Sequence, residues 1–130
     1  MTGLDTNVVV RFLTRDDPSQ AERALEIFRS GQLWLPRTVL LETEWVLRSA
    51  YSLSRQTILA SFRKLMGLPE LLVEDRTVAL QALRWYEEGL GLADALHLAS
   101  SGGADRFVTF DARLARDAEE IADAPAVVGL

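Results

Sequence analysis

The sequence contains no cysteine, one lysine and one histidine. The absence of cysteine excludes disulfides, zinc–thiolate sites and cysteine nucleophiles, although it does not fix the compartment. Every apolar run is shorter than the roughly 18 residues that a membrane-spanning helix needs. The N-terminus also lacks the basic segment and apolar core of a signal peptide. We therefore expect a cytoplasmic protein with no membrane partner.

The composition is that of a globular protein. The chain has 130 residues, of which 48% are hydrophobic and 25% charged, so we expect one domain over residues 1–130. The net charge of −5 argues against a polyanion binder held by bulk charge. Thirteen of the fourteen basic residues are arginine. Arginine suits bidentate phosphate contacts, although genome composition produces the same bias.

Strand-like and helical segments alternate along the chain, which predicts an α/β fold with a mainly parallel sheet. In such sheets, ligands bind at the carboxyl ends of the strands. We expect strands at residues 2–5, 32–36, 70–75 and 106–110, with a final edge strand at 126–130. We expect helices at residues 7–14, 18–30, 37–51, 54–66, 76–88, 92–100 and 111–122. Asp17 and Ser54 are the expected caps, and Gly31, Gly67 and Gly89 the expected stops.

Two acids follow predicted strands directly. Asp5 stands at the carboxyl end of the first strand and Asp111 at the carboxyl end of "RFVTF". Both are therefore candidates for the same crevice. The alternative for each is an N-cap, because each also precedes a helix and aspartate is a favoured capping residue.

A third acid, Glu42, occupies an unusual place on a predicted helix. Its neighbours at helical spacing include Val39, Trp45 and Val46, and no cation stands beside it. By contrast, Glu44 has Arg48 four residues later, which indicates an ordinary surface pair. A buried carboxylate usually pairs or binds a metal, so Glu42 is a candidate ligand. The alternative is that this face is only partly buried.

The fourth acid is Asp94, in the almost wholly apolar segment "LADALHLAS". His97 lies three residues later and shares its helix face. His97 either supports Asp94 or is a core histidine whose nitrogens bond to the backbone, and the core role is the commoner one. Gathered in one crevice, four carboxylates repel one another unless a divalent cation is bound. Oxygen-only ligands favour Mg²⁺ or Mn²⁺ over zinc.

The segments that hold these acids resemble a known family. "GLDTNVVVRFLTRDDP", "LLETEWVLRSAY", "LADALHLA" and "VTFDARL", in this order and spacing, resemble the PIN-domain ribonucleases. The likeness is closest to the toxins of VapBC-type (type II) toxin–antitoxin pairs. It implies a three-layer α/β/α sandwich with a parallel sheet.

The resemblance also implies roles for individual residues. Asp5, Glu42, Asp94 and Asp111 match the family's acidic quartet, and Asp5 and Asp94 match the positions that hold Mg²⁺ most directly. Supporting polar positions that hydrogen-bond within the site are matched by Asn7 and Thr109. Some members carry a further acid after the last one, whereas Ala112, Arg113 and Ala115 follow Asp111 here. This departure leaves one metal or two as alternatives.

The implied activity is metal-dependent hydrolysis of RNA phosphodiester bonds, with Mg²⁺ as cofactor and Mn²⁺ as a substitute. The implied partners are an RNA substrate, a cognate antitoxin and a second copy of the chain in a homodimer. Arg11 and Arg15 are either phosphate contacts or exposed helix charges. Alternatives within the family are a housekeeping RNA-processing nuclease and an inactive binding module of the same fold.

Two other protein classes also place acids at strand ends. A phosphoacceptor receiver domain needs a lysine near its last strand, but Lys64 lies between predicted helices far from that position. A phosphatase of the haloacid dehalogenase type needs Asp-x-Asp early in the chain, and here Asn7 stands two residues after Asp5. The sequence therefore favours the nuclease interpretation.

Overall fold

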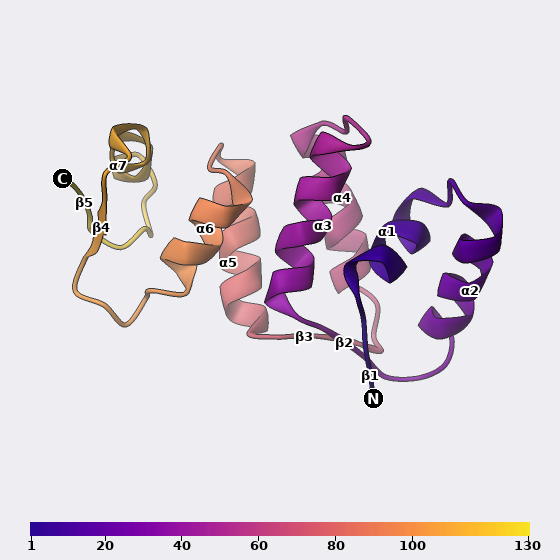
Figure 1. Ribbon diagram of the computed structural model, residues 1–130. Coiled ribbons are helices and arrows are strands. Elements are labelled where there is room, and N and C mark those ends of the chain that lie inside the picture. The colour runs from indigo at the N-terminus through magenta and orange to yellow at the C-terminus, as the bar shows by residue number, and fades with distance from the viewer. The chain divides into compact units, whose positions relative to one another are not determined.

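The computed structural model describes residues 1–130, which divide into two compact units, Met1–Arg76 and Thr77–Leu130. Parallel strands occur in both units, and helices connect them (Figure 1). The predicted α/β fold with parallel strands is therefore confirmed.

The first unit has a parallel sheet of three strands in the order β1-β2-β3. These strands are β1 (Thr2–Gly3), β2 (Leu33–Leu35) and β3 (Leu71–Val73). Two helices make each crossover: α1 (Thr6–Thr14) and α2 (Pro18–Phe28) lead to β2, and α3 (Arg37–Ser49) and α4 (Arg55–Met66) lead to β3. Parallel strands require such long connections, since a tight turn joins only antiparallel neighbours.

Local signals set the boundaries of these helices. The side chain of Asp17 accepts a hydrogen bond from the Gln20 amide at 3.0 Å, and Pro18 follows at the first helical position. Ser54 caps α4 in the same way, accepting from the Thr57 amide at 3.2 Å. Both predicted caps are confirmed. Gly31 has a φ of +133°, which only glycine adopts readily, so the chain turns there into β2.

Helix α1 packs against both α2 and α3. The rings of Phe12 and Phe28 stack with centroids 3.8 Å apart and an interplanar angle of 5°, which joins α1 to α2. Each fully buried aliphatic side chain contributes about 1.5–3 kcal/mol by leaving water. The hydrophobic side chains of the first unit with 1% exposure or less are Val9, Val10, Leu33, Leu35, Leu40, Leu47, Ile58, Phe62 and Leu65.

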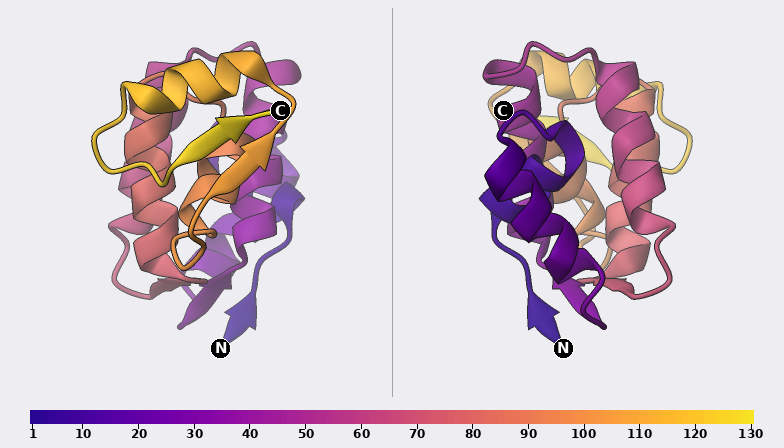
Figure 2. Two further views of the ribbon diagram at one scale, coloured as in Figure 1. Left: turned by 90° about the vertical axis from the view of Figure 1, so that its left-hand side faces the viewer. Right: turned by 90° about the vertical axis from the view of Figure 1, so that its right-hand side faces the viewer.

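The second unit contains α5 (Arg76–Glu87, which starts at the unit boundary), α6 (Leu92–Ala99), β4 (Phe107–Thr109), α7 (Ala112–Glu119) and β5 (Val127–Gly129). β4 and β5 form a parallel pair, and α7 connects them. α7 packs against both strands, and the left view of Figure 2 shows it lying along the pair. The edge strand predicted at the end of the chain is therefore present.

All observed elements except α1 are shorter than the predicted ones, whereas α1 starts one residue earlier, at Thr6. Strand β1 ends at Gly3, although the Leu4 amide still donates to the Trp34 carbonyl at 3.0 Å. The chain leaves the sheet there because Asp5 already occupies the N-cap position of α1. The last helix ends at Glu119, before the predicted residue 122.

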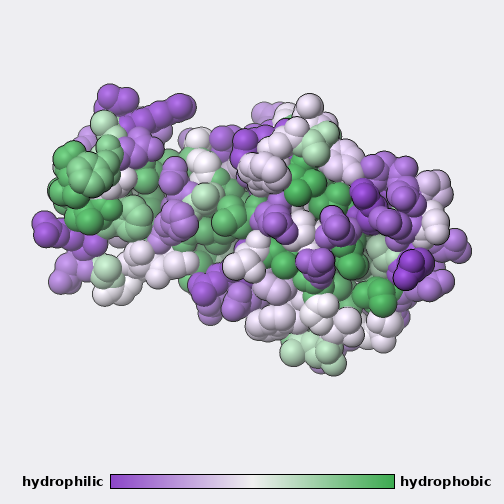
Figure 3. Space-filling model, in the orientation of Figure 1, coloured by the Kyte–Doolittle hydropathy of each residue, from purple (hydrophilic) through white to green (hydrophobic).

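The surface is mixed in character. Hydrophilic residues cover most of the end of the view where α2 lies (Figure 3). Large apolar side chains are also exposed. The bulkiest of these is Trp45 on α3, whose exposed fraction is 59%. No helix combines the length and the apolar character needed to cross a membrane.

Candidate active site

Asp5 follows β1 and occupies the N-cap position of α1, but its side chain makes no capping hydrogen bond. The backbone carbonyl of Asp5 accepts from the amides of Val8 and Val9, so the helix starts without help from the carboxylate. The side chain is exposed and has no hydrogen-bond or ion-pair partner. An aspartate in this position is therefore free to bind a cation.

Glu42, on α3, is connected to the start of α1. The hydroxyl of Thr6, the residue after Asp5, donates a hydrogen bond to Glu42 Oε1. Thr6 is 5% exposed, so its rotamer is fixed by packing. This bond orients the Glu42 carboxylate and holds it on the part of the unit that carries Asp5.

The prediction of a buried apolar face around Glu42 is wrong. Glu42 is exposed, and Trp45 on the same face is 59% exposed. Helix α3 is rotated so that Glu44 points inward instead, and Glu44 is only 3% exposed. The Nε atom of Arg48 lies 2.9 Å from the Glu44 carboxylate. The predicted pairing of Glu44 with Arg48 is confirmed. The prediction that Glu44 lies on the surface is wrong, because Glu44 is buried. Sequence spacing gives the partner of a side chain, whereas its depth depends on the tertiary packing.

The second unit carries the other two acids. Asp94 lies in the first turn of α6 and is partly buried. Its Oδ2 atom lies 3.9 Å from the point where a Cβ on Gly91 would stand, so the carboxylate is close to the N-terminal end of the helix. The helix dipole favours a negative charge there. His97 is exposed, so the prediction of a core histidine is wrong.

Asp111 is the N-cap of α7, as the capping alternative predicted. Its Oδ1 atom accepts from the amides of Arg113 at 3.0 Å and Leu114 at 3.1 Å. The amide of Asp111 donates to Thr109 Oγ1 at 3.0 Å, which fixes the strand-to-helix turn. The cap occupies one carboxylate oxygen, so Oδ2 remains available to a second ligand. Asn7, the other predicted supporting residue, is exposed and makes no hydrogen bond.

The donor chemistry of these four acids fits a hard divalent cation. All four side chains offer only carboxylate oxygens, the ligands that Mg²⁺ and Mn²⁺ prefer. The first unit holds Asp5 and Glu42, and the second holds Asp94 and Asp111. No group of three or more histidine, aspartate or glutamate side chains is arranged to hold a metal ion.

Arg11 belongs to a polar network that the sequence did not indicate. Its Nη1 atom lies 2.8 Å from the hydroxyl of Tyr51 and 3.2 Å from Asp16 Oδ1, and its Nε donates to Gln20 Oε1 at 2.7 Å. The Tyr51 hydroxyl donates to Asp16 Oδ2 at 2.7 Å. Arg11 and Tyr51 are 40 positions apart, so no local spacing relates them.

This network changes two pKa values. The hydrogen bond from Tyr51, and then that from Thr14, lowers the pKa of Asp16 because both stabilise its charged form. Desolvation lowers the pKa of Arg11, but its contacts with Tyr51 and the charges of Asp16 and Asp17 outweigh that effect and raise it. The Arg11 guanidinium therefore stays charged and is paired with the Asp16 carboxylate. Arg15 ends α1 with a φ of +54°, and its guanidinium carbon lies 5.7 Å from the centre of the Phe12 ring.

Comparison with known families decides between the classes considered for this arrangement. The model of the PIN domain family matches residues 4–120, which spans all four acids and both units. The chain belongs to the PIN domain family. No curated protein matches it. PIN domains are generally nucleases, generally bind RNA and typically use divalent metals, so the family match supports the nuclease interpretation over the receiver-domain and phosphatase alternatives.

Proposed function

We propose that this PIN domain protein is a Mg²⁺-dependent ribonuclease and the toxin of a type II toxin–antitoxin pair. The observation that carries the nuclease proposal is the unpaired, exposed carboxylate of Asp5 directly after β1. An aspartate that only capped α1 would use its oxygens on the first amides of the helix. In this protein the carboxylate is left for another purpose.

The roles proposed for the four acids rest on the family resemblance. It assigns Asp5 and Asp94 as the residues that would hold the metal most directly, with Glu42 and Asp111 completing the ligand set. When bound, Mg²⁺ supplies an activated water and stabilises charge on the leaving oxygen. Thr6 holds the Glu42 carboxylate in one orientation, and the α7 cap does the same for Asp111. Preorientation of this kind reduces the reorganisation that catalysis requires.

The experiment compares RNA cleavage by the wild type with that of Asp5→Asn and Asp94→Asn. Each change removes a ligand charge at nearly constant volume, so we expect cleavage to be lost and circular dichroism to be unchanged. Asp123→Asn is the matched control, because Asp123 is exposed and outside the quartet. Normal cleavage by either site variant would disprove the site assignment.

The toxin role rests on partners. Trp45 is 59% exposed on α3, three positions from Glu42, and an exposed aromatic beside an acidic site suits a bound protein segment. We propose that an antitoxin tail covers this surface and places an arginine among the carboxylates, in charge-assisted hydrogen bonds. We further propose that the chain is a single domain over residues 1–130 and forms a homodimer.

The toxin role is tested by measuring RNA cleavage while the C-terminal half of the proposed antitoxin is titrated into the reaction. Inhibition by that peptide, weakened by Trp45→Ala and by loss of the peptide's deepest arginine, is the expected result. Light scattering of the free protein should give the mass of two chains. A monomer that cleaves RNA and is insensitive to the peptide would favour the housekeeping RNA-processing alternative.

A further inference from the structure

A groove in the first unit lies between α1 and α2 and begins at Asn7, two residues after Asp5. Its cavity volume is about 390 Å³, within the range of about 300–1,000 Å³ typical of small-ligand sites. α1 provides Asn7, Val8 and Arg11 to its lining, and α2 provides Gln20, Arg23, Ala24, Glu26 and Ile27. The roles predicted for Asn7 and Arg11 do not account for the α2 side of this groove.

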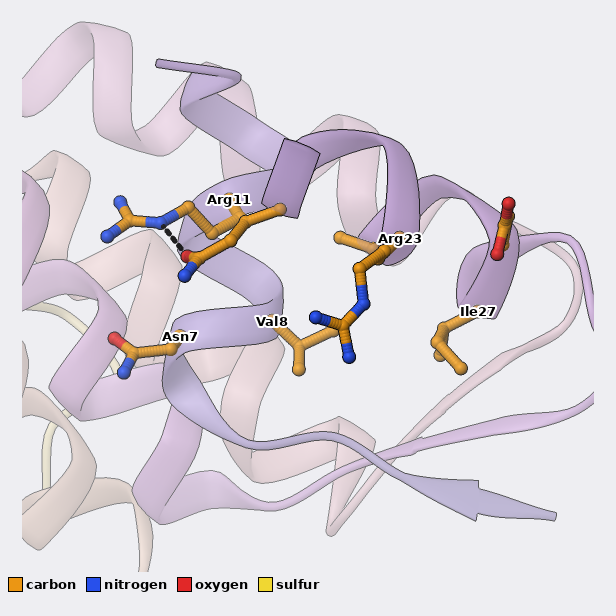
Figure 4. A pocket seen from close by; sticks show the side chains of 8 residues that line it. Asn7, Val8, Arg11, Arg23 and Ile27 are labelled. Carbon is orange, nitrogen blue, oxygen red and sulfur yellow. Dashed lines mark hydrogen bonds between the residues drawn. The ribbon is translucent and has the colours of Figure 1, made fainter. Parts of the chain in front are cut away.

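The groove has two kinds of wall. Val8, Ala24 and Ile27 provide an apolar surface, and Ile27 is 37% exposed. Arg23 provides a cation, and Figure 4 shows its guanidinium extending from α2 toward Val8. An apolar surface beside an unneutralised guanidinium matches a nucleotide, which has a flat base and a charged phosphate.

The two arginines of the groove differ in their availability. The Arg11 guanidinium is hydrogen-bonded to Asp16, Tyr51 and Gln20, so these contacts would have to break before it could bind a phosphate. Arg23 is exposed and has no hydrogen-bond or ion-pair partner, although Glu26 stands three residues later on the same helix. Arg23 is therefore the cation in this groove that can bind a phosphate without breaking an existing contact.

The groove is also preformed. The stacked rings of Phe12 and Phe28 hold α1 against α2, and the hydrogen bond from Arg11 to Gln20 joins the same two helices, as the dashed line in Figure 4 marks. A site whose walls are already fixed loses little conformational entropy when a ligand binds.

We propose that this groove binds one nucleotide of the single-stranded RNA, with its phosphate on Arg23 and its base against Val8 and Ile27. The inference rests on the proposed ribonuclease function and adds a substrate subsite to it. Asn7 lines the groove and stands two residues after Asp5 in the chain, so a strand bound there would lie near Asp5. Arg23 is then a binding residue that sets the position of the substrate relative to the acids.

The test measures binding and cleavage separately. Binding of a fluorescent single-stranded RNA is followed by anisotropy in EDTA, where no hydrolysis occurs, over a range of salt concentrations. For Arg23→Gln we expect RNA binding to be about fivefold weaker. The plot of the logarithm of the association constant against the logarithm of salt concentration should also become less steep by about 0.7, which is the value for one phosphate contact on a single strand. In cleavage assays the same variant should raise KM more than it lowers kcat.

Three further variants make the test specific for the groove. Glu26→Gln removes the negative charge that opposes phosphate in the groove, so binding should become tighter. Arg29→Gln removes the same charge as Arg23→Gln from the end of α2, outside the groove, so binding should change little. Ile27→Ser should weaken binding without changing the salt slope, because it alters the base surface and not the charge.

The outcomes separate this proposal from the proposed function. If Arg23→Gln binds RNA like the wild type, or if Arg29→Gln is equally impaired, the groove proposal is overturned even when cleavage is normal. If the wild type does not cleave RNA with Mg²⁺ or Mn²⁺ but the four variants bind as described, the groove proposal stands and the ribonuclease proposal fails.

Discussion

The hydroxyl of Thr6 donates a hydrogen bond to the carboxylate of Glu42, 36 positions further along the chain. Thr6 is buried directly after Asp5, and Glu42 is exposed on α3. The bond therefore connects the helix that follows β1 with the helix that follows β2. It gives the candidate site of the first unit a fixed geometry that neither helix provides alone.

The first prediction concerns this bond. Thr6→Val keeps the shape of the side chain and removes the donor, so it should destabilise the protein by about 1 kcal/mol. Because Glu42 then loses its fixed orientation, cleavage should fall by about tenfold, as for other groups that orient metal ligands. Denaturant unfolding and RNA cleavage rates measure the two effects. Thr6→Ser retains the hydroxyl and should recover most of the activity; equal loss in both variants would show that packing, and not the bond, matters.

The second prediction separates the two roles of Asp111. Asp111→Ala removes the α7 cap and should cost about 1 kcal/mol of stability together with the cleavage activity. Asparagine caps as well as aspartate but carries no charge. Asp111→Asn should therefore unfold at the same denaturant concentration as the wild type and still lack activity. If Asp111→Asn cleaves RNA normally, the residue is only a cap.

The third prediction concerns metal binding in solution. A ligand that binds only the folded state raises its melting temperature by mass action. Millimolar Mg²⁺ or Mn²⁺ should therefore raise the melting temperature of the wild type, and the rise should be smaller in Asp94→Asn. Calorimetry with and without EDTA measures both shifts. Equal shifts in the two proteins would place the metal away from Asp94.

The fourth prediction concerns the pH dependence of stability. The hydrogen bond from Tyr51 lowers the pKa of Asp16 in the folded state below its usual value of 3.8. The ionised carboxylate therefore contributes stability above that value, and the contribution is lost as the pH falls through the lowered pKa of the folded state. Tyr51→Phe should melt at a lower temperature than the wild type near neutral pH, and the difference should shrink below about pH 4.

The control for the pH effect is Asp16→Asn, in which the group cannot titrate. Combined with Asp16→Asn, Tyr51→Phe should lower the melting temperature by an amount that does not vary between pH 3 and pH 7, about the range in which an aspartate titrates. Parallel pH profiles for Tyr51→Phe and the wild type would show that the bond from Tyr51 does not affect Asp16.

The order of the elements and the positions of the acids along them follow from local features of the sequence. Alternation of apolar segments, the caps at Asp17 and Ser54 and the turn at Gly31 are local signals, and local signals are read from neighbouring residues. The positions of Asp5 and Asp111 at strand ends are also local signals, because each residue directly follows a strand-like segment in the chain.

Tertiary structure alone decided the depth and the partners of the side chains. The rotation of α3 buries Glu44 and exposes Glu42 and Trp45, although helical spacing favoured the opposite. The partners of Arg11 and of Glu42 stand 40 and 36 positions away, at distances in the chain where no sequence pattern operates. A helix presents a fixed pattern of side chains, but only its packing against other elements selects which of them face the core.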